Sequence, residues 1–242
     1  QVTCQQISRS KASPQRPATR QMSAPNRLAL FDCDGTLVDS QHDIVEAMNR
    51  CFDAVKLAPP TRLETLAVIG LSLPQAMARL LPDAEGHFHD HLAAQYKLAF
   101  QHMRRTNGVS EPLYPGITEL IARLAQAGWM LGVATGKSDR GLHNCLTAHG
   151  IIEHFITLQT ADRHPSKPHP SMALQAMADA GAAPETTVMI GDTSYDMEMA
   201  ANAGMRALGV NWGYHSVEEL MQSGAQVVAV DMAELERHII GS

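Results

Sequence analysis

The chain has 242 residues, a hydrophobic content of 45% and a formal net charge of −6, with a pI near 6.0. This length suits one α/β core with a small second domain. The negative charge argues against nucleic acid or an anionic membrane as the main partner, and no apolar run approaches the length of a transmembrane helix. Without metal-ligand spacing, the cysteines are expected to be reduced thiols: Cys4, Cys33, Cys51 and Cys145.

Residues 1–26 differ from the rest of the chain. They include basic residues, many Ser, Gln and Pro, no acidic residue and no apolar period, which predicts a disordered basic tail. The tail resembles an organellar transit peptide in composition, which would place the protein in an organellar matrix. Alternatively it precedes the true start, because Met22 lies just before the first expected strand. We favour this second account, and with it a cytoplasmic location.

The apolar run at residues 28–31 predicts a strand buried on both faces of a parallel sheet. It is followed by the pentad Asp32-Cys33-Asp34-Gly35-Thr36. Mg²⁺ binds hard oxygens, typically one or two carboxylates together with a substrate phosphate, and an Asp carboxylate can accept a phosphoryl group covalently. The pentad therefore predicts a magnesium and phosphoryl site, the alternative being an acidic strand end that caps the next helix.

Residues 41–112 show helical spacing and no strand-like run, so we expect a helical insertion here. Pro59-Pro60 and Asn107-Gly108 interrupt it. A helix would turn His89 away from His87 and His91, so we expect this triplet on a solvated face rather than at a metal. The apolar residues at helical spacing lie in three stretches, around 44–55, 76–81 and 92–103.

From Pro115-Gly116 onward, strand and helix alternate, which is the βαβ signature of a doubly wound sheet. We therefore predict an α/β fold in which residues 27–40 and 113–242 form a mainly parallel, Rossmann-like core and residues 41–112 a small α-helical cap. Strands are expected at 130–134, 155–159, 187–190, 206–210 and 226–230, with helices near 139–149, 169–180, 195–203, 217–222 and 232–240.

Polar residues follow three of these strands. Asp32 and Asp34 end the first, Thr135 the second, and Gly191-Asp192 a later one. Because the carboxyl ends of parallel strands line one crevice, we expect these groups to converge. Lys167 lies among Pro165, Pro168 and Pro170, in a loop with few backbone options. Together they predict a site for a phosphoryl group and its metal.

Asp32-Cys33-Asp34-Gly35-Thr36-Leu37-Val38, Thr135, Lys167 and the segment from Gly191-Asp192 to Asp196 resemble, in order and spacing, the four motifs of the haloacid dehalogenase superfamily. The resemblance covers residues 27 to about 231. Within the superfamily the chain is most similar to phosphoglycolate-phosphatase-like hydrolases, which carry a helical cap between the first and second motifs. This resemblance implies a phosphoric monoester hydrolase.

The resemblance also assigns roles to the catalytic residues. Asp32 would attack phosphorus and form an aspartyl-phosphate, while Asp34 would protonate the leaving alkoxide and then deprotonate the hydrolytic water. Thr135 and Lys167 would hold the non-bridging oxygens. Lys137 could contact the substrate, but we expect it to point into solvent.

The same resemblance implies Mg²⁺ as the cofactor. Its ligands would be Asp32, the backbone carbonyl of Asp34 and Asp192. Asp196 would act from outside the metal's own ligands, orienting bound water or Lys167. Asp39-Ser40 is expected to cap the first helix of the insertion.

The substrate is less well defined by sequence. The loop Gly70–Pro74 carries no charge, which favours a small phosphorylated metabolite such as 2-phosphoglycolate, bound by a monomer or homodimer. Two alternatives stay open: a phosphosugar mutase of the same superfamily and a non-catalytic phosphate-binding protein. The basic residues that could bind a substrate carboxylate, each with surface solvation as the default, are Arg79, Lys97, Arg104 and Arg105.

Overall fold

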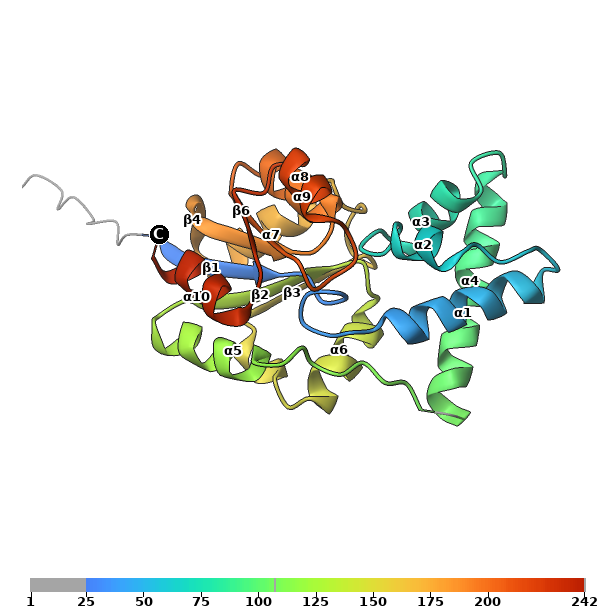
Figure 1. Ribbon diagram of the computed structural model, residues 1–242, viewed down its shortest axis with the longest axis horizontal. Coiled ribbons are helices and arrows are strands. Elements are labelled where there is room, and N and C mark those ends of the chain that lie inside the picture. The colour runs from blue at the N-terminus through green and yellow to red at the C-terminus, as the bar shows by residue number, and fades with distance from the viewer. Residues whose placement is uncertain (1–24, 107, 242) are drawn as a thin grey trace, which may run out of the picture.

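The computed structural model describes residues 25–106 and 108–241 (Figure 1). Its described part contains a six-stranded, all-parallel sheet with strand order β3-β2-β1-β4-β5-β6, which confirms the predicted fold class. The strands are β1 (Asn26–Phe31), β2 (Met130–Thr135), β3 (Thr157–Thr160), β4 (Ala182–Gly191), β5 (Arg206–Val210) and β6 (Val227–Ala229). The predicted tail lies outside the described residues, except that β1 already begins at Asn26.

The central strand β1 is buried on both faces, as its apolar run predicts. Leu28, Ala29, Leu30 and Phe31 are all fully buried. Ala29 and Phe31 belong to one apolar cluster, whereas Leu28 and Leu30 belong to another on the opposite face. This alternation follows from the two-residue period of a strand, and it requires helices on both sides of the sheet.

Helices cover both faces, as Figure 1 shows. One face carries α5 (Ile117–Gln126), α6 (Asp139–Ala148) and α10 (Met232–Ile240), and the other carries α7 (Ser171–Ala180), α8 (Ser194–Asn202) and α9 (Val217–Gln222). A 3₁₀ turn, η1 (Ile152–His154), precedes β3. Helix α5 lies where no helix was predicted. No helix in the described ranges is long and apolar enough to cross a membrane.

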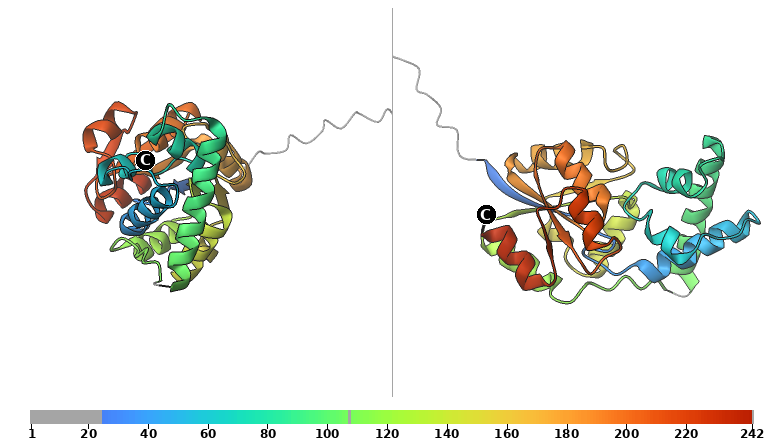
Figure 2. Two further views of the ribbon diagram at one scale, coloured as in Figure 1. Left: turned by 90° about the vertical axis from the view of Figure 1, so that its right-hand side faces the viewer. Right: turned by 45° about the horizontal axis from the view of Figure 1, so that its top comes forward.

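The insertion after β1 consists of helices packed around an apolar cluster of their own, which includes Met48, Phe52 and Leu92. It lies at the carboxyl edge of the sheet, at the opposite end of the molecule from the C-terminus (Figures 1 and 2). Its helices are α1 (Gln41–Ala54), α2 (Arg62–Leu66), α3 (Leu73–Leu80) and α4 (Gly86–Thr106).

The histidine triplet is only partly on a solvated face. His87 and His91 are exposed, as predicted, but His89 is buried. The Nε2 atom of His89 lies 2.9 Å from the carbonyl oxygen of Leu81. Helix α4 therefore places His87 and His91 on its exposed side and His89 inside the insertion, in contact with a backbone carbonyl.

Two chain segments join the insertion to the sheet, and they run side by side. The N–H of Asp39 donates to the Pro112 carbonyl at 2.8 Å, and the N–H of Tyr114 donates to the Leu37 carbonyl at 3.0 Å. Cys33, Cys51 and Cys145 are free thiols, as predicted; Cys4 lies outside the described residues.

Candidate active site

The site lies where the strand order reverses. The chain runs outward from β1 through β2 to β3 on one side, and from β4 through β5 to β6 on the other. Ligands of doubly wound sheets bind at this switch point, beyond the carboxyl ends of the strands. Asp32 follows β1 and Asp192 follows β4, the two strands that meet there, with Phe31 paired to Ile190.

Lys167 reaches this point from the loop between β3 and α7. Its ammonium nitrogen lies 3.0 Å from Asp32 Oδ1 and 2.6 Å from Asp196 Oδ1, and all three side chains are fully buried. The other oxygen of Asp196 accepts hydrogen bonds from the N–H and hydroxyl of Thr193, at 3.1 and 2.7 Å. The structure thus brings together the predicted carboxylates and the predicted lysine.

Asp192 is held by both of its oxygens and does not cap the following helix. Oδ1 accepts from the hydroxyl of Thr36 at 2.7 Å, and Oδ2 accepts from the N–H of Tyr214 at 3.0 Å. Gly35 makes this approach feasible: its φ is +83°, and a Cβ there would lie 2.1 Å from Asp192 Oδ2. Tyr214 lies in the loop after β5, which was not predicted to contribute to the site.

The cluster is rich in negative charge. Carboxylate oxygens of Asp32, Asp192 and Asp196 lie within 4.8 Å of one another, and Lys167 offsets one charge. Burial, together with the carboxylates of Asp32 and Asp196, raises the pKa of Asp192 well above its ordinary value. Burial also raises the pKa of Asp32 to about 7, although Lys167 opposes the shift.

One carboxylate oxygen of Asp32 has no hydrogen-bond partner among the described residues. Its Oδ1 accepts from the N–H of Cys33 at 2.7 Å and from Lys167, whereas its buried Oδ2 has no hydrogen-bond partner among the described residues. An orphaned buried oxygen inside an acidic cluster fits a hard divalent cation, which would relieve both the missing contact and the excess charge.

Asp34 belongs to a second set of contacts. Lys137 Nζ lies 2.8 Å from Asp34 Oδ1 and 2.6 Å from Glu111 Oε1, and the Ser40 hydroxyl also donates to Asp34. Burial alone would lower the pKa of Lys137, but the two carboxylates outweigh it and hold that pKa well above its ordinary value. Arg104 of α4 in turn contacts Glu111 at 3.0 Å.

Two expectations are corrected by these contacts. Lys137 does not point into solvent, because Asp34 and Glu111 hold its ammonium group in a nearly buried position. Ser40 occupies the N-cap position of α1 but makes no side-chain cap hydrogen bond, because its hydroxyl donates to Asp34 instead. Of the predicted pair, Asp39 does accept the N–H of Gln41, the first residue of α1, at 3.4 Å. Thr135 ends β2, as predicted, and is buried. Its hydroxyl oxygen accepts the N–H of Lys137 at 3.2 Å.

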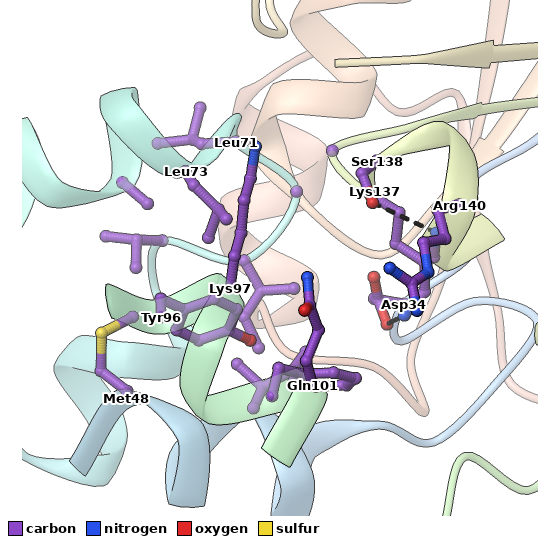
Figure 3. A pocket seen from close by; sticks show the side chains of 18 of the residues that line it. Asp34, Met48, Leu71, Leu73, Tyr96, Lys97, Gln101, Lys137, Ser138 and Arg140 are labelled. Carbon is purple, nitrogen blue, oxygen red and sulfur yellow. Dashed lines mark hydrogen bonds and ion pairs between the residues drawn. The ribbon is translucent and has the colours of Figure 1, made fainter. Parts of the chain in front are cut away.

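A cavity of about 230 Å³ opens beside Asp34, between the insertion and the core (Figure 3). The loop Gly70–Pro74 forms part of its wall through Gly70, Leu71 and Leu73. The insertion touches the core closely here: the N–H of Ser72 donates to the Ser166 hydroxyl at 2.8 Å. A Cβ on Gly136 would lie 2.5 Å from the Leu71 carbonyl oxygen.

Comparisons with known proteins agree with this geometry. The sequence model of the haloacid dehalogenase-like hydrolases matches residues 29–210. A probable phosphatase IndB of Dickeya dadantii is 36% identical, over 86% of this chain and 91% of its own length. A phosphoglycolate phosphatase of Vibrio vulnificus is 30% identical, over 86% of this chain and 94% of its own.

The fold is also found in solved structures. The crystal structure of a predicted phosphatase from Clostridium acetobutylicum superposes with a TM-score of 0.81 at 23% identity, covering 91% of this chain and all of that one. The family predicted from the four motifs is confirmed, and with it the prediction of a hydrolase. The chain belongs to the haloacid dehalogenase-like hydrolases and, within them, is similar to phosphoglycolate phosphatases.

Proposed function

We propose that the protein is a Mg²⁺-dependent phosphatase that hydrolyses a phosphate monoester of a small metabolite through an aspartyl-phosphate. The observation that carries the proposal is the free Oδ2 of Asp32 inside the buried cluster with Lys167 and Asp192. The names of the relatives from Dickeya and Vibrio support the reaction. 2-Phosphoglycolate, named in the Vibrio relative, is the reference substrate.

The two aspartates of the pentad divide the chemistry. A carboxylate oxygen of Asp32 attacks phosphorus, the bond from phosphorus to the ester oxygen breaks, and Asp34 gives its proton to the departing oxygen. Water then attacks the phosphorus of the aspartyl-phosphate, Asp34 takes a proton from that water, and inorganic phosphate leaves with Asp32 restored. Ser40 and Lys137 fix the orientation of Asp34 for both steps.

The metal site draws on the same cluster. The proposed ligands are Asp32, Asp192 and the backbone carbonyl of Asp34. Asp196 acts through its contact with Lys167. When bound, Mg²⁺ would offset repulsion between the carboxylates and the incoming phosphate. Lys167 and Thr135 are proposed to hold the non-bridging phosphate oxygens.

The insertion is proposed to act as a cap. Helices α1 to α4 enclose the cavity beside Asp34, and the loop Gly70–Pro74 seals it against Gly136. Such a cover excludes water during phosphoryl transfer. We propose that the cap receives a small metabolite, neither nucleic acid nor membrane, and that the protein works as a monomer or homodimer.

Phosphate release from 2-phosphoglycolate and phenyl phosphate, with Mg²⁺ or with EDTA, tests the proposal. We expect release only with Mg²⁺. Asp32→Asn should abolish turnover, because a carboxamide cannot form the acyl phosphate. Asp39→Asn is the matched control, since Asp39 contacts Gln41 rather than the cluster. Substantial turnover by Asp32→Asn, or substrate isomerisation without phosphate release as in a mutase, would contradict the proposal.

A further inference from the structure

Part of the cavity wall carries positive charge that nothing in the described chain neutralises. Lys97 and Arg105 of α4 and Arg140 of α6 line the cavity, are exposed, and make no ion pair with any described residue. Figure 3 shows Lys97 and Gln101 rising from α4 on one side of the cavity, with Arg140 on the other side. Arg104 differs, because it is paired with Glu111.

Apart from Asp34, the described lining of the cavity contains no acidic group to balance these cations. Among its described lining residues the one carboxylate is Asp34, which already contacts Lys137. The spacing of Lys97, Gln101 and Arg105, four residues apart on α4, places them along one face of that helix. The cavity therefore presents a row of unpaired donors to whatever occupies it.

Much of the rest of the wall is apolar. Met48, Ile69, Leu73 and Phe100 are among the side chains that form it, contributed by three helices and a loop of the insertion. The cavity volume of about 230 Å³ is several times the roughly 30 Å³ that one water molecule takes in the liquid. Glycolate, a two-carbon acid, would fill only part of this volume and would leave apolar wall uncovered.

The position of the cavity indicates which part of the substrate enters it. Asp34 lines the cavity, whereas Asp32 and Lys167 do not. Under the proposed mechanism Asp34 meets the ester oxygen of the leaving group, so the leaving group extends from Asp34 into the cavity. The lining of the cavity then describes the leaving group rather than the phosphate.

Building on the proposed function, we propose that the preferred substrate is a phosphomonoester whose leaving group has an apolar body larger than glycolate and a second anionic group. The body packs against the apolar wall of the insertion. The anionic group lies against Lys97, Arg105 and Arg140, which act as specificity determinants.

Matched alkyl phosphates test the two halves of this inference. Benzyl, 4-carboxybenzyl and 4-(aminomethyl)benzyl phosphate differ in charge, whereas 4-carboxybenzyl phosphate and 2-phosphoglycolate share a carboxylate and differ in apolar body. We expect kcat/KM for the carboxylate to exceed that for benzyl phosphate by roughly tenfold, the size expected for a few exposed charge contacts. The aminomethyl compound should be the poorest of the three, and 4-carboxybenzyl phosphate should surpass 2-phosphoglycolate.

Charge-removing variants locate the effect. Lys97→Met, Arg105→Met and Arg140→Met, singly and combined, should erase most of the preference for the carboxylate while leaving benzyl phosphate within about twofold of wild type. Arg79→Met is the control, because Arg79 is an exposed cation of α3 outside the cavity lining. The preference should also shrink at high salt, which screens exposed charges.

Three results would overturn the inference. A carboxylate preference that survives the combined variant would contradict the assigned cations, and a higher kcat/KM for 2-phosphoglycolate would contradict the larger apolar body. In both cases phosphate is still released, so the proposed function stands. Absence of phosphate release from every compound with Mg²⁺ would instead overturn the proposed function, and this inference with it.

Discussion

Lys137 offers a sharp test of how the site is held together, because replacing it with Met leaves two carboxylates without their shared cation. Its nitrogen lies 2.8 Å from Asp34 and 2.6 Å from Glu111, and these side chains are at most 10% exposed. At such distances each attraction amounts to about 6 kcal/mol with an effective dielectric constant of about 20. Desolvation offsets much of this, and removing one partner of a buried pair typically costs about 3–5 kcal/mol.

We therefore expect Lys137→Met to lower the free energy of unfolding by about 3–5 kcal/mol. Urea denaturation at pH 7 in EDTA measures it, with the slope of the transition checked against wild type. Arg123→Met is the matched control. Arg123 pairs with Glu236 at a similar 2.8 Å, but its side chain is 46% exposed, so its loss should cost at most about 1 kcal/mol.

A double variant separates charge from packing. In Lys137→Met, the carboxylates of Asp34 and Glu111 are left without their cation. If this causes the loss of stability, Glu111→Gln should lower the free energy of unfolding less in the Lys137→Met background than in the wild-type background, because it removes one of the two unpaired charges. Equal losses for Lys137→Met and Arg123→Met, or strictly additive losses in the double variant, would refute the reasoning.

Three further predictions concern the metal, the acid and the cap. Mg²⁺ at about a hundred times its Kd should raise the Tm of the wild-type protein, measured by calorimetry, by roughly 5–10 °C and that of Asp192→Asn much less. Equal shifts in Tm would exclude Asp192 as a ligand. Asp34→Asn should slow the single-turnover release of ethanol from ethyl phosphate by about 10²-fold or more, because the leaving ethoxide needs a proton. Release of 4-nitrophenolate from 4-nitrophenyl phosphate should slow much less, and equal losses would exclude Asp34 as the acid. Gly136→Val should push the insertion off Leu71 and lower kcat/KM by about 10- to 100-fold, and unchanged kinetics would show that this contact does not govern closure.

The sheet could be predicted from sequence because most of its strands contain a short apolar run bounded by polar or glycine residues; β3, with the sequence Thr-Leu-Gln-Thr, is the exception. Two helices of the structure, α5 and α2, were not predicted. In α5 the buried residues Ile117, Leu120 and Leu124 lie at helical spacing, so the sequence does indicate a helix at this place. In α2, only five residues long, the available signal was the capping box between Thr61 and Glu64.

The sequence predicted the site residues that follow strands, and its loop prolines and the resemblance to the family added Lys167 and Asp196, which do not. Asp32 and Asp192 follow strands, and the structure joins them through Lys167. Glu111 and Tyr214 could not be found this way, since each lies in a loop and reaches the site through contacts between segments distant in sequence. Their positions follow from how the loops pack against the sheet, which no local pattern in the sequence encodes.

The side-by-side course of the two connecting segments has a consequence for how such proteins diversify. Because Val38 and Leu113 lie opposite each other, the insertion between them is joined to the sheet by two adjacent segments, and its two ends lie close together. A segment whose ends lie close together can be replaced as a cassette without disturbing the host fold. Transplanting residues 41–112 between relatives should therefore exchange substrate preference while the phosphoryl chemistry, built on the strands, stays in place.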